Sequence, residues 1–163
     1  MSLLSKKKRK FGFTLVEVII VGGLFALVAS FSAINILRSQ THSTLVSQVT
    51  IFVSDSRSQQ VRAMAGDSQG QSTSGDWGIH LENNRYVLFR GSTYSAGDGG
   101  NFIVNLGSTM AISWTLPTAD IVFVKRSGEV VSYTEGANTV TFTNSASGEH
   151  AQLTINRYGS ISR

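Results

Sequence analysis

The chain contains no cysteine and a single proline among its 163 residues. Without cysteine it can form neither a disulfide nor a thiolate metal site, and its redox compartment cannot be read from composition. Its histidines, His42, His80 and His150, lie far apart and lack the spacing of metal ligands, so we assign each a surface role. The sequence also lacks a Walker-type phosphate-binding loop. We therefore expect no enzymatic activity, no metal and no cofactor.

Negative charge is absent from the amino end of the chain. All ten acidic residues follow Gly12, whereas five of the fourteen Lys and Arg residues occupy positions 6–10. Without those five, nine basic and ten acidic side chains remain, so the formal charge of +4 describes the amino end and does not indicate a nucleic-acid-binding domain. The basic cluster ahead of an apolar run predicts an amino terminus in the cytoplasm and the rest of the chain outside.

An apolar run of 25 residues, Phe13–Leu37, follows the basic cluster and contains one charge, Glu17. As a helix it would be about 37 Å long, enough to cross a hydrocarbon core of roughly 30 Å. An acid inside a membrane costs on the order of 2.5–3.5 kcal/mol at mid-bilayer, so Glu17 is a candidate functional residue. The alternative is a plain anchor whose acid reaches the headgroups.

These residues resemble the cleavage and methylation segment of the type IV pilin superfamily, with Lys6–Lys10 as leader, Gly12 as its last residue and Glu17 four positions after Phe13. The resemblance implies that a prepilin peptidase/N-methyltransferase cuts between Gly12 and Phe13 and methylates the Phe13 amine. It also implies that Glu17 pairs with the Phe13 ammonium of a neighbouring subunit. Cleavage there retains the apolar run, unlike ordinary signal cleavage.

Beyond Arg38 the pattern becomes amphipathic and then changes to that of strands. We expect residues 1–12 to be a leader, 13–37 and 38–65 the two halves of one helix, 66–76 a flexible connection and 77–163 a β-rich head. Apolar residues recur near helical spacing in the second half, at Leu45, Val49, Phe52, Val53, Val61 and Met64. Gly66 is the expected stop.

Period-two patterns predict seven or eight short strands in the head. The predicted strands are Trp77–Leu81, Arg85–Arg90, Phe102–Leu106, Met110–Leu116, Ile121–Lys125, Val130–Tyr133, Thr139–Thr143 and Gln152–Asn156. The expected fold class is α+β: a long N-terminal hydrophobic-then-amphipathic helix packed on a small antiparallel β-sheet head, as in pilins. The Trp-Gly hairpin and the closing segment Arg157–Ile161 resemble the GspH/FimT type of minor pseudopilin.

Some relatives of that type bind DNA through a Gly-Arg-x-Arg tail. The corresponding residues here, Gly159-Ser160-Ile161-Ser162-Arg163, lack both motif arginines. The remaining candidates for nucleic-acid contacts are Lys125, Arg126, Arg157 and Arg163. Phosphate binding needs clustered cations, and the alternative is a solvated face.

Together these patterns favour a structural subunit, a minor pilin or pseudopilin serving type II secretion, type IV pilus function or DNA uptake. Its expected partners are other subunits through the N-terminal helix, the prepilin peptidase, an assembly platform and the cytoplasmic membrane before assembly, with DNA as a subsidiary partner. Its expected location is the inner membrane, as a single-pass protein with its amino end inside, and then a periplasmic or extracellular filament. The alternative is an anchored or signal-peptidase-processed extracellular binding domain, cut near Ser30 or Ser32.

Overall fold

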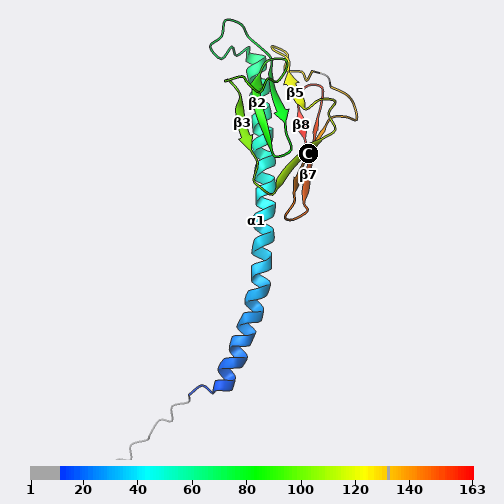
Figure 1. The fold of residues 1–163 in the computed structure, drawn as a ribbon. Helices are drawn as coiled ribbons and strands as arrows, with labels where there is room; N and C mark the ends of the chain where they lie inside the picture. The colour runs from blue at the N-terminus through cyan, green and yellow to red at the C-terminus, as the bar shows by residue number, and fades with distance from the viewer. Residues whose placement is uncertain (1–11, 132) are drawn as a thin grey trace, which may run out of the picture. The chain divides into compact units, whose positions relative to one another are not determined.

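The computed structural model describes residues 12–131 and 133–163, with the side chains of residues 30–43 excepted. Helix α1 spans Leu15–Ala65. The chain divides into two units, Met1–Ser39 and Gln40–Arg163, and the second unit contains every strand of the described part of the chain (Figure 1). The predicted leader cations, Lys6–Lys10, lie outside the described residues.

The end of α1 is fixed by backbone hydrogen bonds at a glycine. Gly66 has a φ of 68°, which a residue without a Cβ adopts at little cost. Its N–H donates to the carbonyl of Ala63 at 3.1 Å, and the next N–H, of Asp67, donates to Arg62 at 3.0 Å. These bonds satisfy carbonyls that the helix leaves unpaired, and the prediction that Gly66 ends the helix is confirmed.

One stripe of α1 is buried in the second unit. It recurs at alternating intervals of four and three residues, the spacing of one helix face, and consists of Leu45, Val49, Phe52, Ser56, Gln59 and Ala63. The sequence-based stripe was correct for its first three members and wrong at its end, since Val61 and Met64 are 62% and 52% exposed. Two polar residues therefore occupy core-facing positions.

The first sheet has the strand order β3-β2-β1-β5, with all pairs antiparallel. Its strands are β1 (Trp77–Leu81), β2 (Arg85–Arg90), β3 (Phe102–Asn105) and β5 (Asp120–Phe123). The predicted β1–β2 hairpin is confirmed, and Arg85 holds its turn by donating to both carboxylate oxygens of Glu82, at 2.7 and 3.0 Å. These hydrogen bonds lower the pKa of Glu82 and raise that of Arg85.

The second sheet has the order β4-β6-β7-β8 and is also antiparallel. Its strands are β4 (Met110–Trp114), β6 (Thr139–Asn144), β7 (His150–Ile155) and β8 (Ile161–Ser162). The predicted strand Val130–Tyr133 is wrong for its described residues, because only an isolated bridge joins Val130 to Phe123 there. Strand β8 was not predicted, since two residues are too short to show a period.

The core of the second unit is shared by α1 and both sheets. Phe52 of α1 packs edge-on against Tyr86 of the first sheet and Phe142 of the second, with ring centroids 5.2 and 5.1 Å apart. The Tyr86 hydroxyl donates to the Asp55 carboxylate at 2.6 Å. Burial raises the pKa of Tyr86 well above its ordinary value, and the bond to Asp55 adds to the effect.

The predicted fold class needs correction in two respects. The head is built from two four-stranded sheets and not from one small sheet. The helical stretches with described side chains, residues 15–29 and 44–65, fall in different units, so packing on the head is found for the second stretch alone. The physical reason for the extra sheet is that the hairpins divide between two pairing sets, β1–β2 with β3 and β5, and β6–β7 with β4 and β8. The fold is mixed α+β.

The predicted single-pass membrane location is also corrected. Within the described residues, no helix combines the length and the apolar character needed to span a bilayer.

Candidate functional site

The start of α1 is capped by Thr14. Its side-chain Oγ1 accepts a hydrogen bond from the N–H of Glu17 at 3.3 Å, and its carbonyl accepts one from Val18 at 3.2 Å. Thr14 followed three residues later by Glu17 is the Thr-x-x-Glu pattern of a capping box, in which an acid also lies favourably near the positive end of the helix dipole. Our sequence analysis missed this local role of Glu17, although the spacing alone contains the signal.

The predicted cleavage site precedes this cap. Gly12 and Phe13 lie in non-helical backbone and both are exposed, Phe13 at 81%. Exposed, non-helical backbone is where proteolysis concentrates, so these two residues are compatible with the predicted cut, which stays a prediction. Glu17, one turn further on, is exposed as well.

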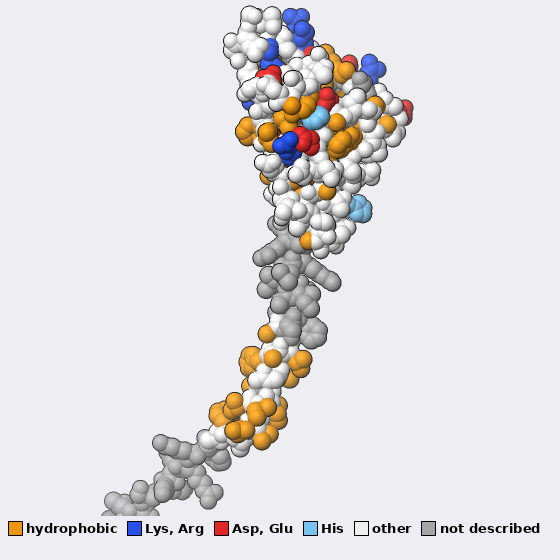
Figure 2. All heavy atoms as spheres, viewed as in Figure 1, with side chains coloured by type: hydrophobic (Ala, Val, Ile, Leu, Met, Phe, Trp, Pro, Cys, Tyr) orange, Lys and Arg blue, Asp and Glu red, His pale blue; other side chains and the backbone are white. Residues whose placement is uncertain are grey.

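Apolar side chains surround the first described turns of α1. Seven of them are between 60% and 76% exposed: Leu15, Val16, Val18, Ile19, Ile20, Leu24 and Phe25. At about 100° per residue these positions point to every side of the helix, and Figure 2 shows hydrophobic side chains along this stretch. A helix that is apolar all round is normally buried, so this stretch is a candidate contact surface on all of its sides.

The four candidate nucleic-acid residues do not form one patch. Backbone hydrogen bonds place Arg126 against Ala63 at 2.8 Å and Lys125 against the Asp76 carboxylate at 2.8 Å, near the end of α1, and Arg157 pairs with Val130 close by.

Arg163, by contrast, lines a shallow groove with Val49 and Val53. These helical residues lie roughly 15–21 Å along the axis from Ala63. Three of the four cations thus lie near one another with an acid among them, and the fourth lies far away. This arrangement provides few phosphate contacts, which favours the alternative of a solvated face.

His80 is not the simple surface residue that we expected. Its Nδ1 lies 2.6 Å from Asp120 Oδ1, and the ring of Tyr94 stacks on its imidazole with centroids 4.0 Å apart. The pair arises because His80 of β1 and Asp120 of β5 are cross-strand partners. No sequence signal could have joined two residues forty positions apart.

An Asp-His pair orients an imidazole, but nucleophilic catalysis also needs a hydroxyl or thiol within reach. No such hydrogen bond to His80 is found in the described part of the chain. The spacing Gly-x-Ser-x-Gly does occur, at Gly66–Gly70, where it follows a helix and leads into turns. A nucleophile elbow instead joins a strand to a helix, so Ser68 has neither the backbone nor a base partner for that role. Among the described residues no three His, Cys, Asp or Glu side chains gather as a metal site.

Comparison with known proteins adds no relative. No family model, curated protein or solved structure matches this chain. The pilin resemblance therefore stays a prediction from the sequence, based on residues 6–21 and on the pattern of the head.

Proposed function

We propose that this chain is a pilin-like subunit of a filament, in which the apolar start of α1 packs against the same segment of other copies. The observation that carries the proposal is the exposed apolar surface on every side of residues 15–25, with one carboxylate, Glu17, among them. A single partner groove covers one face of a helix, whereas a bundle of copies covers all of them.

The free energy available from burying these side chains is large enough to drive association. Burying a large apolar side chain contributes about 1.5–3 kcal/mol, so the seven exposed side chains together contribute roughly 10–20 kcal/mol. Association costs about 4–15 kcal/mol in lost freedom of motion. A subunit that shares this surface with several neighbours therefore has a favourable balance.

Glu17 sets the register in this proposal. Buried among apolar helices it requires a cation, and the amine of Phe13, freed by cleavage after Gly12, supplies one below its usual pKa of roughly 8. A prepilin peptidase acting at the accessible Gly12–Phe13 bond would create that amine. The protein then works as a minor pilin or pseudopilin of a secretion, pilus or DNA-uptake filament.

The test separates the charge of Glu17 from its place in the helix cap. Glu17→Gln removes the charge but keeps a residue that serves in a capping box, whereas Thr14→Ala removes the cap and keeps the charge. Both variants are expressed with the matching filament genes, and incorporation is measured in sheared filaments. We expect Glu17→Gln to be cleaved but not incorporated, and Thr14→Ala to be incorporated.

Two results would contradict the proposal. Equal loss of incorporation in both variants would show that Glu17 acts only on its own helix. Mass spectrometry of the mature protein should find N-methyl-Phe at residue 13; a chain that starts at or beyond Phe31 would instead identify a released binding domain.

A further inference from the structure

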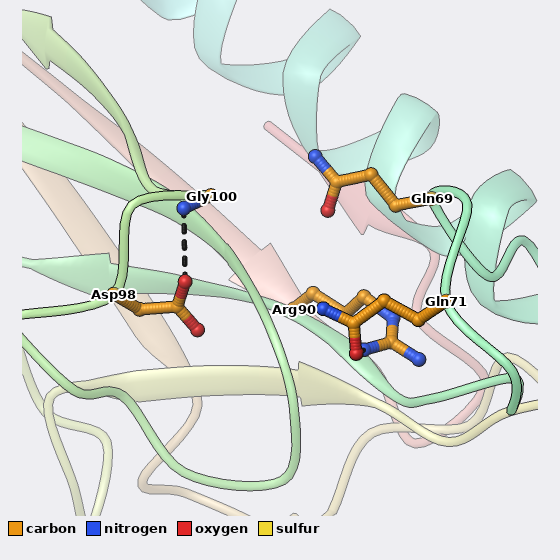
Figure 3. Close-up of a pocket in the computed structure, with 5 residues that line it drawn as sticks. All are labelled: Gln69, Gln71, Arg90, Asp98 and Gly100. Carbon is orange, nitrogen blue, oxygen red and sulfur yellow. Dashed lines mark hydrogen bonds between the residues drawn. The ribbon is translucent and has the colours of Figure 1, made fainter.

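Two adjoining cavities open on the head, outside everything that the filament proposal uses. The first, of about 260 Å³, is lined by Gln69, Gln71, Arg90, Asp98 and Gly100 (Figure 3). The second, of about 530 Å³, runs between the last turns of α1 and β3, and its lining includes Gln59, Arg62 and Phe102. Gln69 and Gly100 line both cavities, so the two adjoin at these residues, and we call them together the amide groove.

The walls of the first cavity are held in place by Arg90. One terminal nitrogen, Nη1, donates to Gln71 Oε1 at 2.7 Å, and the other, Nη2, donates to the carbonyl of Thr73. The facing loop is ordered by Asp98, whose Oδ1 accepts the N–H of Gly100 at 2.9 Å (Figure 3). The third nitrogen of the guanidinium, Nε, is buried and has no acceptor among the described residues.

The second cavity is lined by a buried acceptor that lacks a donor. Gln59 is 3% exposed, and its Oε1 accepts no hydrogen bond within the described part of the chain. A buried acceptor without a donor destabilises the fold and calls for a specific explanation. The terminal torsion of a glutamine side chain has a broad energy profile, so the amide can turn toward a donor that enters the cavity.

The charges along the groove balance. Its lining contains two arginines, Arg62 and Arg90, and two acids, Asp55 and Asp98, and Arg62 lies over the ring of Trp77 at 4.9 Å. A ligand with a net charge would be attracted by the side chains of one sign and repelled by those of the other. The groove therefore suits a neutral molecule with many hydrogen-bonding groups.

We propose that the amide groove binds a neutral sugar of one or two rings. The several hydroxyl or acetamido groups of a sugar offer a donor for Gln59 in one cavity and an acceptor for Arg90 in the other, which the described part of the chain does not provide. The apolar C–H face of a pyranose matches the exposed ring of Phe102, which is 65% accessible. The combined volume of the cavities accommodates such a ligand.

The experiment titrates the full-length chain with four compounds and follows binding by the shifts of its amide NMR signals. The compounds are N,N′-diacetylchitobiose, lactose, 3′-sialyllactose and trialanine. We expect one of the two neutral sugars to bind with a millimolar or lower dissociation constant. Gln59→Met should weaken it about tenfold by removing the amide. The same variant should not unfold at lower urea concentration, because it also removes the unpaired acceptor. Gln48→Met, on the same helix outside the groove, is the matched control.

A second pair of variants tests the groove without touching Gln59. A Cβ on Gly100 would lie 3.4 Å from Asp98 and 3.5 Å from Gln69, so Gly100→Val fills the junction of the two cavities, whereas a Cβ on Gly97 meets nothing within 4 Å. Gly100→Val should abolish binding and Gly97→Val should not.

Four outcomes would overturn the proposal. They are no shift with either neutral sugar at millimolar concentration, binding that neither Gln59→Met nor Gly100→Val weakens, a preference for 3′-sialyllactose over lactose, and binding of trialanine alone. The third would indicate an anion site and the fourth a peptide groove.

Discussion

Replacing Phe52 tests whether one side chain joins α1 to both sheets. Phe52 is fully buried and touches an aromatic ring on each sheet, Tyr86 and Phe142. Phe→Ala substitutions in cores cost about 3–5 kcal/mol, from lost burial and the cavity left behind. Phe52→Leu retains most of the volume and loses the two aromatic pairs, worth about 0.5–1.5 kcal/mol each, so it should cost about 1–3 kcal/mol.

Urea unfolding of the full-length chain, followed by tryptophan fluorescence, measures both losses. A loss of 4 kcal/mol with a urea dependence of about 2 kcal/mol per molar moves the midpoint by roughly 2 M. Ile51→Ala, one position away and 42% exposed, is the control and should cost under about 1 kcal/mol.

The reasoning fails if Phe52→Ala costs no more than Ile51→Ala. It also fails if the helix and the sheets of the head unfold in separate transitions in the unsubstituted protein, because a shared core requires them to unfold together.

Two further predictions concern the first sheet. Tyr86 keeps its proton in the folded state above pH 10, where the unfolded chain releases it, so the free energy of unfolding should fall by about 1.4 kcal/mol per pH unit above pH 10. Urea titrations at pH 9 and 11 should find that this loss is absent in Tyr86→Phe. Gly78→Ala should cost about 1–3 kcal/mol of stability, since its Cβ would lie 2.6 Å from the Phe89 ring and 2.9 Å from the Ile121 carbonyl oxygen. Gly97→Ala should be neutral, and equal urea midpoints for the two variants would contradict the geometry.

The stripe of α1 illustrates where sequence reasoning was incomplete. Periodicity identified Leu45, Val49 and Phe52, because apolar residues there follow the buried face. Further on, the buried positions are occupied by Gln59 and Ala63, and apolar side chains lie on exposed ones. Hydropathy reports which residues prefer burial, whereas the sheets beneath the helix decide which positions are buried.

The candidate sites also fall into those that the sequence shows and those that only the folded structure shows. The capping box at Thr14 and Glu17 was present in the sequence, because its partners are three residues apart. The His80–Asp120 pair and the amide groove were not, because their members come from elements that meet only through strand pairing and helix docking.

The sequence by itself determined the local elements: the end of α1 at Gly66, the β1–β2 hairpin and most strands. Each depends on residues within a few positions of one another, so propensity, capping and period suffice. Only the tertiary structure decided that the strands divide into two sheets and that Gln59 lies buried with an unpaired oxygen. Those features arise from contacts between residues far apart in the chain, whose pairing depends on how the whole core packs.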